Sequence, residues 1–343
     1  MCIGLYQLMI SNQCNLRCSY CFNNWESSLL DWPVLKPAPI EDIIKFINKT
    51  RCENVLIDFS GAEPLTNFEF IKDFISHKLE KVEYSIVTNG TLLDSDRIDF
   101  MLEHFKTIIF SLDGTEKANQ ARKYTNGSAS WSDALSNLIE AFAKNSYKVS
   151  VLMTLHSGNI NNFDQSYRFI VLELGIPANI SIDYKSLTSK YHETLYQKFH
   201  KVFIDERLPL PAFFEEKVLS NRHKYKSENF CRSLSQSVTV NLDGTLSFCH
   251  LLAPNIKERN SGASRIYGDI YKGIDFENKF YKQLEKRIVI GMPECKNCPA
   301  ASWCKGGCIA AHNILTQSFD KLDKNQCEIH KIIEKIAQEI REQ

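Results

Sequence analysis

The sequence predicts an α/β protein, in which a partial (β/α)6 barrel is followed by a small cysteine-rich region. From residue 4 to about 205, short β-rich runs alternate with amphipathic helical stretches, which is typical of βα units around a parallel sheet. Beyond residue 231 the chain is instead dense in cysteine and glycine. With 343 residues, 43% of them hydrophobic, the chain is long enough to fill two cores.

Six βα units can be counted, which is six-eighths of a full barrel. Strands are expected at 5–10, 55–59, 84–88, 107–112, 148–155 and 179–185. Amphipathic helices are expected to follow at about 41–49, 68–79, 95–104, 132–143, 162–174 and 191–205. In parallel α/β folds ligands lie beyond the C-terminal ends of the strands. The positions there are polar or glycine-rich, namely 12–21, 60–64, 89–90, 113–114 and His156.

The second part begins after a linker at 206–230 that is rich in charge and proline, so we expect a barrel at 1–205 and a cysteine-rich domain at 231–343. Alternation at 237–241 and 245–248 around Asp243-Gly244 predicts a β-hairpin. Residues 295–308 are too dense in cysteine and glycine for regular structure. An amphipathic helix is expected from Cys327 to about 340.

Charge and compartment exclude several classes of partner. The chain has 41 basic and 41 acidic residues and no block of like charge, so it offers no footprint for nucleic acid or an anionic membrane. The apolar run at 4–10 is too short for a signal peptide or a membrane span, which predicts a cytoplasmic protein. In a reducing cytosol most of the twelve cysteines are expected to bind metal or act in catalysis. Cys2 and Cys52 stand outside both cysteine groups, and we expect them to be small buried hydrophobes.

The first cysteine group, Cys14-x3-Cys18-x2-Cys21, falls in the loop after the first strand. A cubane iron-sulfur cluster normally takes four thiolates, so three in one tight loop leave the fourth iron open as a reaction site. Structural zinc would need a fourth nitrogen or sulfur ligand, and no histidine lies nearby to supply it. The spacing therefore favours an iron-sulfur cluster.

Residues 12–21 resemble the signature of the radical S-adenosylmethionine (radical SAM) enzymes. The segment at 61–64 is similar to that superfamily's Gly-Gly-Glu-Pro motif, with Ala62 in place of one glycine. Residues 88–93 resemble the segment after the third strand, and 111–114 the segment after the fourth. Singly these are ordinary turns, but they occur in order after successive strands.

This resemblance implies a TIM-like partial barrel and a 4Fe-4S cluster that binds S-adenosylmethionine through its open iron. The residues implied to contact the cofactor are Tyr20, Gly61, Ala62, Glu63, Asn89, Ser111 and Arg122. One electron, expected from a flavodoxin- or ferredoxin-type donor, cleaves the cofactor. The resulting 5′-deoxyadenosyl radical then takes a hydrogen atom from the substrate.

The second cysteine group resembles the SPASM domain that follows radical SAM barrels acting on peptides. Paired zinc ribbons are the alternative, but the intervals of two, five and three residues do not divide into short cysteine pairs. The resemblance implies two auxiliary 4Fe-4S clusters, three clusters in all. One would be held by Cys295, Cys298, Cys304 and Cys327. The other, auxiliary cluster I, would have only Cys231, Cys249 and Cys308, and hence an open iron or a non-cysteine ligand.

The leading hypothesis is a maturase that oxidatively cross-links a ribosomally made precursor peptide through a carbon-carbon or thioether bond. Sulfatase maturation ranks second, because those relatives place a catalytic aspartate where this chain has His250. Oxidation of a small alcohol or sugar is a further alternative, and an electron-transfer scaffold is disfavoured by the cofactor motifs. The chain starts at the first strand, so leader recognition is expected from the barrel, the linker or a separate protein.

Candidates for a catalytic base or substrate contact lie near strand ends or the hairpin. They are Asp58, Asp113, Asp183 and His250. Acidic residues at such positions are commonly capping groups, which remains the alternative for the three aspartates. A lone histidine beside a hairpin is more often only hydrogen-bonded.

Overall fold

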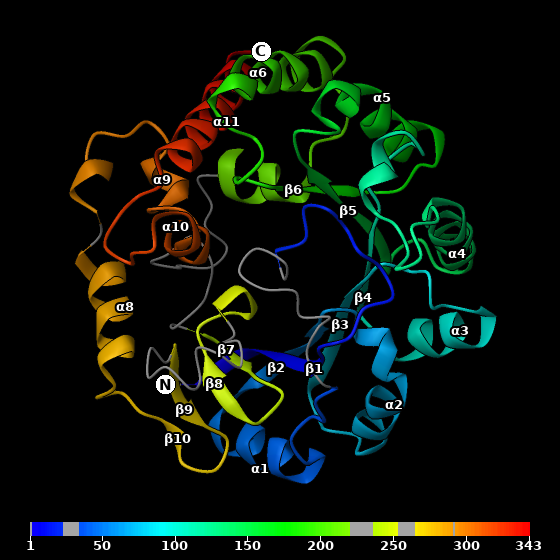
Figure 1. Ribbon diagram of the computed structural model, residues 1–343, viewed down its shortest axis with the longest axis vertical. Coiled ribbons are helices and arrows are strands. Elements are labelled where there is room, and N and C mark those ends of the chain that lie inside the picture. The colour runs from blue at the N-terminus through cyan, green and yellow to red at the C-terminus, as the bar shows by residue number, and fades with distance from the viewer. Residues whose placement is uncertain (1, 23–33, 220–235, 253–264, 291) are drawn as a thin grey trace.

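A computed structural model describes residues 2–22, 34–219, 236–252, 265–290 and 292–343. Its centre is a ten-stranded sheet in the order β10-β9-β8-β7-β1-β2-β3-β4-β5-β6, with helices arranged around the outside (Figure 1). The predicted α/β class, with a parallel partial barrel and a C-terminal hairpin, is confirmed.

All six predicted barrel strands are present and pair in parallel in chain order. They are β1 (Ile3–Ser11), β2 (Arg51–Gly61), β3 (Val82–Thr88), β4 (Thr107–Ser111), β5 (Val149–Leu155) and β6 (Ala178–Ile182). The helices that follow them are α1 (Ile40–Thr50), α2 (Phe68–Ser76), α3 (Ser95–His104), α4 (Trp131–Lys144), α5 (Phe163–Arg168) and α6 (His192–His200). The last two continue as π-helical turns, η6 (Phe169–Glu173) and η8 (Lys201–Asp205), which completes their predicted lengths.

The period-two alternation of the strands sets the two faces of the sheet. Side chains that point outward pack on the helices: the Tyr6 ring meets Phe46 of α1 edge-on, with centroids 6.1 Å apart. Residues on the other, inner face are more polar and remain partly accessible, as at Gln7 and Asp58. A ligand of the barrel would therefore meet the inner face.

The predicted hairpin is formed by β7 (Ser237–Val240) and β8 (Thr245–Ser247), which pair antiparallel with Gly244 in the turn at φ +83°. Two strands follow that the sequence did not predict, β9 (Ile266–Asp269) and β10 (Gly273–Ile274). Strand β7 pairs in parallel with β1. The C-terminal strands therefore belong to the same sheet as the barrel strands and cross the predicted domain boundary. The domain boundaries themselves stay predictions.

The remaining helices gather on one side of the sheet, where α11 lies beside α6 (Figure 1). They are α8 (Lys279–Ile290), α9 (Ala301–Cys304), α10 (Ile309–Thr316), α11 (Lys324–Glu342) and the π-turn η9 (Phe214–Leu219). The 3-10 turns are η3 (Pro64–Asn67), η4 (Ala118–Ala121), η5 (Ile160–Asn162), η7 (Ser189–Tyr191), η10 (His250–Leu252) and η11 (Pro293–Cys295). No helix in the described ranges combines the length and apolar composition that a membrane crossing needs.

Two expectations about the C-terminal part are corrected. Residues 295–308 are not wholly irregular, since they contain one helical turn, α9. Helix α11 begins three residues before Cys327, because the Asp323 carboxylate caps it by accepting a hydrogen bond from Gln326 N at 2.7 Å.

The prediction that Cys2 and Cys52 are buried hydrophobes is wrong. Cys2 is exposed and Cys52 is half-buried, and the two form a disulfide with Cα atoms 4.9 Å apart. The cause is the strand register, because Ile3 of β1 lies opposite Arg51 of β2 and brings the two neighbouring cysteines together.

Candidate active site

The first cysteine group lies in the loop that leaves the C-terminal end of β1. Its three thiols are half-buried and form no disulfide among the described residues. The loop is pinned by the segment at 121–125: Arg17 N donates to Lys123 O at 2.7 Å, and Ser19 N donates to Ala121 O at 3.1 Å. These backbone bonds hold the cysteine loop against the segment that carries Arg122.

Burial raises the pKa of the Cys14 thiol to about 12 and that of Cys18 to about 11, although nearby Arg122 lowers the latter. The charges of Cys18 and Cys21 raise the pKa of Cys14 further, so the three thiols lie near one another. Buried thiols of this kind ionise only beside a cationic group such as a metal. Among the described residues no three His, Cys, Asp or Glu side chains converge on a single-ion site. Three neighbouring thiols would fit three corners of an iron-sulfur cubane.

The turn at 61–64 follows β2 and sits beside the cysteine loop. Ala62 N donates to Ser11 O at 3.0 Å, and Glu63 N donates to Gln13 O at 2.9 Å. Gly61 has φ +147°, and a Cβ on it would lie 2.4 Å from Ser11 O. Only glycine allows β1 and β2 to approach this closely.

The Glu63 carboxylate is buried and held by the chain's own donors. It accepts hydrogen bonds from Leu65 N (3.1 Å), Thr88 Oγ1 (2.7 Å) and Asn89 N (2.8 Å). Burial raises its pKa, and these donors oppose that effect. The Asn89 amide in turn donates to Asn15 Oδ1 at 2.9 Å. Glu63 thus ties the ends of β2 and β3 to the cysteine loop.

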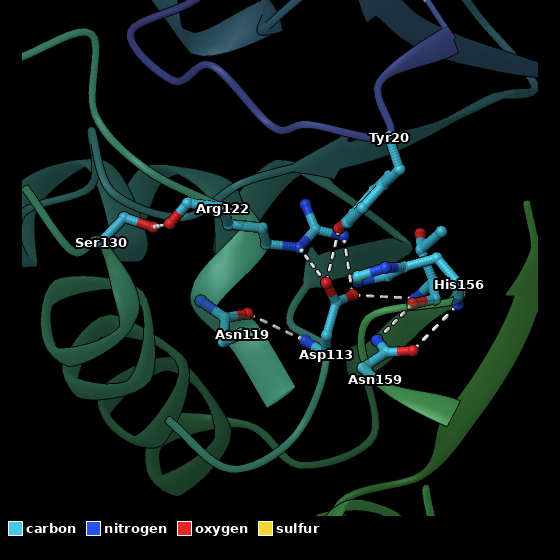
Figure 2. A network of polar contacts seen from close by, with 8 residues as sticks. Tyr20, Asp113, Asn119, Arg122, Ser130, His156 and Asn159 are labelled. Atoms are coloured by element: carbon cyan, nitrogen blue, oxygen red, sulfur yellow. Dashed lines mark hydrogen bonds and ion pairs between the residues drawn. The ribbon is translucent and has the colours of Figure 1, made fainter. Parts of the chain in front are cut away.

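A buried ion pair lies below the loop (Figure 2). Arg122 donates to both oxygens of Asp113, each at 3.1 Å. Tyr20 OH donates to Asp113 Oδ2 at 2.6 Å, and Thr154 N donates to Oδ1 at 2.9 Å. Burial alone would lower the pKa of Arg122, but the charge and hydrogen bond of Asp113 and the charges of Tyr20 and Cys18 together outweigh it and raise that pKa. Both carboxylate oxygens of Asp113 therefore already accept hydrogen bonds from the chain itself.

His156, at the end of β5, stacks on Tyr20 with ring centroids 4.6 Å apart (Figure 2). Its Nδ1 accepts a hydrogen bond from Gly158 N at 3.1 Å, so in the neutral ring Nε2 carries the proton. Burial lowers its pKa, which favours the neutral form. The residue is only 6% exposed, and Nε2 has no hydrogen-bond partner among the described residues. This buried N–H donor is available to a ligand.

A polar row crosses the inner face of the sheet, one residue from each of β7, β1, β2 and β3. Strand register aligns Thr239, Gln7, Asp58 and Ser85. Thr239 Oγ1 donates to Gln7 Oε1 at 3.0 Å, and Ser85 Oγ donates to Asp58 Oδ1 at 2.7 Å. Burial raises the pKa of Asp58 to about 6.

His250 stands at one end of this row. Its Nδ1 lies 3.4 Å from Gln7 Oε1, and its ring lies 5.4 Å from that of Phe22, which follows Cys21. Burial lowers the pKa of His250 to about 4. A residue of the C-terminal part is thus placed between the inner face of β1 and the cysteine loop.

The other predicted site residues lie at the strand ends as expected by position. Ser111 is half-buried at the end of β4. Asp183 is buried just after β6, where its Oδ1 accepts a hydrogen bond from Lys185 N at 3.1 Å, the bond of a turn-capping residue.

Four of the C-terminal cysteines lie within electrostatic range of one another. After burial, the charges that raise the pKa of Cys304 to about 12 include those of Cys295, Cys327 and Cys298. These are the four cysteines that the resemblance to SPASM domains implies as ligands of one cluster. Cys231 lies outside the described residues. Cys249 precedes η10, which packs against α10, the helix that Cys308 caps.

A hydrogen-bonded chain joins the barrel to this second group. His330 lies one helical turn after Cys327, with Nδ1 3.0 Å from Cys304 Sγ and Nε2 2.9 Å from the hydroxyl of Tyr184, which follows β6. Neither His330 nor Gln7 was predicted from the sequence, and no role was predicted for His156. Cys327-x2-His330 on a predicted helix was an available signal, because residues three apart share a helix face.

Comparison with known proteins agrees with this geometry. The sequence model of the radical SAM superfamily matches residues 8–170. The chain is 25% identical to the "Radical SAM cyclopropyl synthase TigE" of Paramaledivibacter caminithermalis over 96% of this chain and 73% of that protein. It is 26% identical to a "Cysteine-type anaerobic sulfatase-maturating enzyme" of Clostridium novyi over 87% and 85% of the two chains.

Two solved structures share the fold. "Native anSMEcpe with bound AdoMet and Cp18Cys peptide" superposes with a TM-score of 0.78 at 21% identity, covering 98% of this chain and 97% of that one. "Streptococcus suis SuiB bound to precursor peptide SuiA" gives 0.62 at 14% identity, covering 95% and 76%. By the match to this sequence model, residues 8–170 form a radical SAM domain.

Proposed function

We propose that this protein is a radical SAM oxidoreductase that modifies a ribosomally made peptide and cross-links it oxidatively. The observation that carries the proposal is the meeting of three elements on one inner face: the cysteine loop, the polar row and His250. The likeness to the cyclopropyl synthase, and to a fold seen with a bound precursor peptide, supports a peptide substrate.

The residues at the barrel end fit the cofactor of this superfamily. When bound, S-adenosylmethionine on a 4Fe-4S cluster supplies the radical that removes a substrate hydrogen. Cys14, Cys18 and Cys21 would hold the cluster, and the backbone at 61–64 would meet the cofactor beside it. The unpartnered Nε2–H of His156 would donate to an acceptor at the same end of the barrel. We infer that Asp113 orients Arg122 and Tyr20 rather than acting as a base, because its oxygens are already committed.

The polar row would form the substrate-facing wall. Asp58 makes no ion pair within the described ranges, so its carboxylate is open to a hydrogen-bond donor of the peptide. His250 would take the substrate proton, since it is the candidate base that touches both the row and the loop. Asp183 would remain a turn-capping residue.

The C-terminal cysteines would form a SPASM domain with two auxiliary clusters that take up the electron left by oxidation. The shared surroundings of Cys295, Cys298, Cys304 and Cys327 support one of them. The other would rest on Cys231, Cys249 and Cys308 with a non-cysteine fourth ligand or an open iron. A flavodoxin- or ferredoxin-type protein would donate the first electron, and a separate protein could present the leader.

Sulfatase maturation is the second candidate function. Its support is the 26% identity to the sulfatase-maturating enzyme over most of both chains. The two candidates can be separated by co-expressing a short peptide encoded next to this protein's gene and measuring its mass. Cross-linking removes two hydrogens, whereas sulfatase maturation yields an aldehyde.

The first test is Cys18→Ala. The variant should release no 5′-deoxyadenosine from S-adenosylmethionine under reducing, anaerobic conditions, because the cluster loses one of its three thiolate ligands. Cys2→Ser, outside both cysteine groups, is the matched control and should retain cleavage. Cleavage by Cys18→Ala at the control's rate would refute the assignment of this loop.

A further inference from the structure

The guanidinium of Arg287 is buried on helix α8. The residue is only 6% exposed, and its Nη1 donates to the backbone carbonyl of Phe319. Its Nη2 is buried and has no hydrogen-bond partner among the residues that the structure describes. Within the described part of the chain no carboxylate forms an ion pair with it. A buried unpaired charge costs several kcal/mol or more, so the folded protein requires an anion here.

The groups around Arg287 identify that anion. Burial lowers the pKa of Arg287, while the charges of Asp320, Cys295, Cys308 and Cys327 raise it. Asp320 is exposed and accepts a hydrogen bond from Gln283 at 3.0 Å, so it does not fill the buried position. The remaining charges belong to cysteines of the second group. Thiols compensate a cation only as thiolates, which is their state as iron ligands.

His330 makes a second contact of the same kind from the opposite helix, α11. As a ligand Cys304 is a thiolate and can only accept a hydrogen bond, so the 3.0 Å contact requires a proton on His330 Nδ1. Nε2 then accepts from the hydroxyl of Tyr184 at 2.9 Å. The tautomer of His330 is therefore fixed by its two neighbours.

We propose that Arg287 and His330 are positioning residues that raise the reduction potential of the cluster held by Cys295, Cys298, Cys304 and Cys327. The inference rests on the proposed function, in that this cluster must exist. Taking up one electron changes the cluster with its four thiolates from a dianion to a trianion. A buried cation and an N–H donor to sulfur stabilise the more negative state, and hydrogen bonds to the sulfurs are among the factors that set such potentials. The auxiliary cluster is thereby made the better electron acceptor.

The experiment is a redox titration followed by electron paramagnetic resonance. It uses the full chain, reconstituted anaerobically, with Cys14, Cys18 and Cys21 replaced by alanine so that only C-terminal clusters contribute. Arg287→Met removes the charge and Arg287→Lys keeps it. Lys286→Met removes an exposed charge from the neighbouring position of the same helix and is the matched control. His330→Leu removes the N–H donor, and His330→Asn retains one.

We expect Arg287→Met to lower the ratio of reduced to oxidised cluster about tenfold at a fixed potential, which is about 59 mV for a one-electron couple. His330→Leu should shift the potential in the same direction by less, and Lys286→Met, Arg287→Lys and His330→Asn should stay near the parent value. If Arg287→Met loses the cluster while Arg287→Lys keeps it, charge compensation is supported.

Three outcomes would contradict the proposal, and each contradicts a different part: the clusters themselves, the effect on reduction potential, or the role of the Arg287 charge. Absence of iron from the parent protein would overturn the auxiliary clusters and with them the proposed function. A cluster with unchanged potential in both Arg287→Met and His330→Leu would overturn only the present inference. Loss of the cluster from Arg287→Met and Arg287→Lys alike would show that Arg287 acts through shape rather than charge.

Discussion

At the scale of single residues, the end of the barrel depends on one buried charge pair. The side chains of Asp113 and Arg122 are 0% and 9% exposed, and Tyr20 adds a third donor to the same carboxylate. Tyr20 also lies between Arg122, whose guanidinium is 5.3 Å from its ring centroid, and the His156 ring. The aromatic side chain of the cysteine loop is thus positioned by charge from another loop.

Removing one member of this pair should be costly. Asp113→Ala leaves Arg122 buried without its anion, so we expect the free energy of unfolding to fall by about 3–5 kcal/mol. Urea denaturation measures the loss. The control is Lys45→Ala, which breaks the exposed pair with Asp42 and should cost less than about 1 kcal/mol. Equal losses in the two variants would mean that burial of the Asp113 pair has no energetic consequence.

Asp58 gives the inner face a pH dependence. Its pKa is about 6 in the folded chain against 3.8 ordinarily, so folding favours its protonated form. The stability it contributes is complete below about pH 4 and is lost as the pH rises through about 6, a loss of about 1–3 kcal/mol. Asp58→Asn keeps an acceptor for Ser85 and should remove this fall. The measurement is the free energy of unfolding of the parent and of Asp58→Asn, each at about pH 5 and about pH 7.5. An equal change between the two pH values in both proteins would contradict this prediction.

The two cysteine groups and the motifs at the strand ends could be recognised from the sequence, because their spacing along the chain is visible without the fold. The sequence did not predict the polar row, because Gln7, Asp58 and Ser85 come from three strands whose register only the folded sheet reveals. It also left Asp113 open as a base, since its commitment to Arg122 depends on a loop of no fixed pattern. The unpartnered nitrogen of Arg287 left no sequence signal at all.

At the scale of elements, the close approach of β1 and β2 supports the cysteine loop. Ser11 accepts a hydrogen bond from Ala62 N through its carbonyl, and its hydroxyl lies 2.6 Å from Thr66 Oγ1. The turn that carries Gly61 is therefore held against the start of the cysteine loop, which follows Ser11 directly.

Gly61→Ala should disturb this junction. The added Cβ would meet Ser11 O at 2.4 Å, so we expect a loss of about 1–3 kcal/mol from the strained backbone, together with reduced iron uptake by the cysteine loop. Gly127→Ala is the control, because Gly127 also has positive φ but no atom within 4 Å. Thermal unfolding and iron content measure both effects. A Gly61 variant no worse than the Gly127 variant would show that the contact relaxes freely.

The barrel elements were predictable because each has a clear period, two for the strands and 3.6 for the helices. The C-terminal elements were not: β9 and β10 have four and two residues, and α10 is apolar on most of its surface. Short or evenly apolar segments carry no readable period. The Cys2–Cys52 disulfide was missed because it depends on strand pairing rather than on either cysteine's neighbours.

At the scale of the whole molecule, the two cysteine groups should have separable roles. Cys298→Ala removes a ligand of the proposed C-terminal cluster but leaves the loop at β1 intact, so S-adenosylmethionine cleavage should persist while modified peptide is lost. Release of 5′-deoxyadenosine and mass spectrometry of the peptide measure the two activities in one reaction. Product at the parent level from Cys298→Ala would argue against electron transfer through this cluster.

The pairing of β7 with β1 has a further consequence. A chain cut after the sixth βα unit would leave the backbone donors and acceptors of β1 unpaired along one edge, open to any other strand in solution. The same ladder leaves no hinge between β1 and the hairpin that leads to Cys249 and His250. When a substrate enters, β1 and the hairpin should therefore move together, because the backbone hydrogen bonds between β1 and β7 hold them in place.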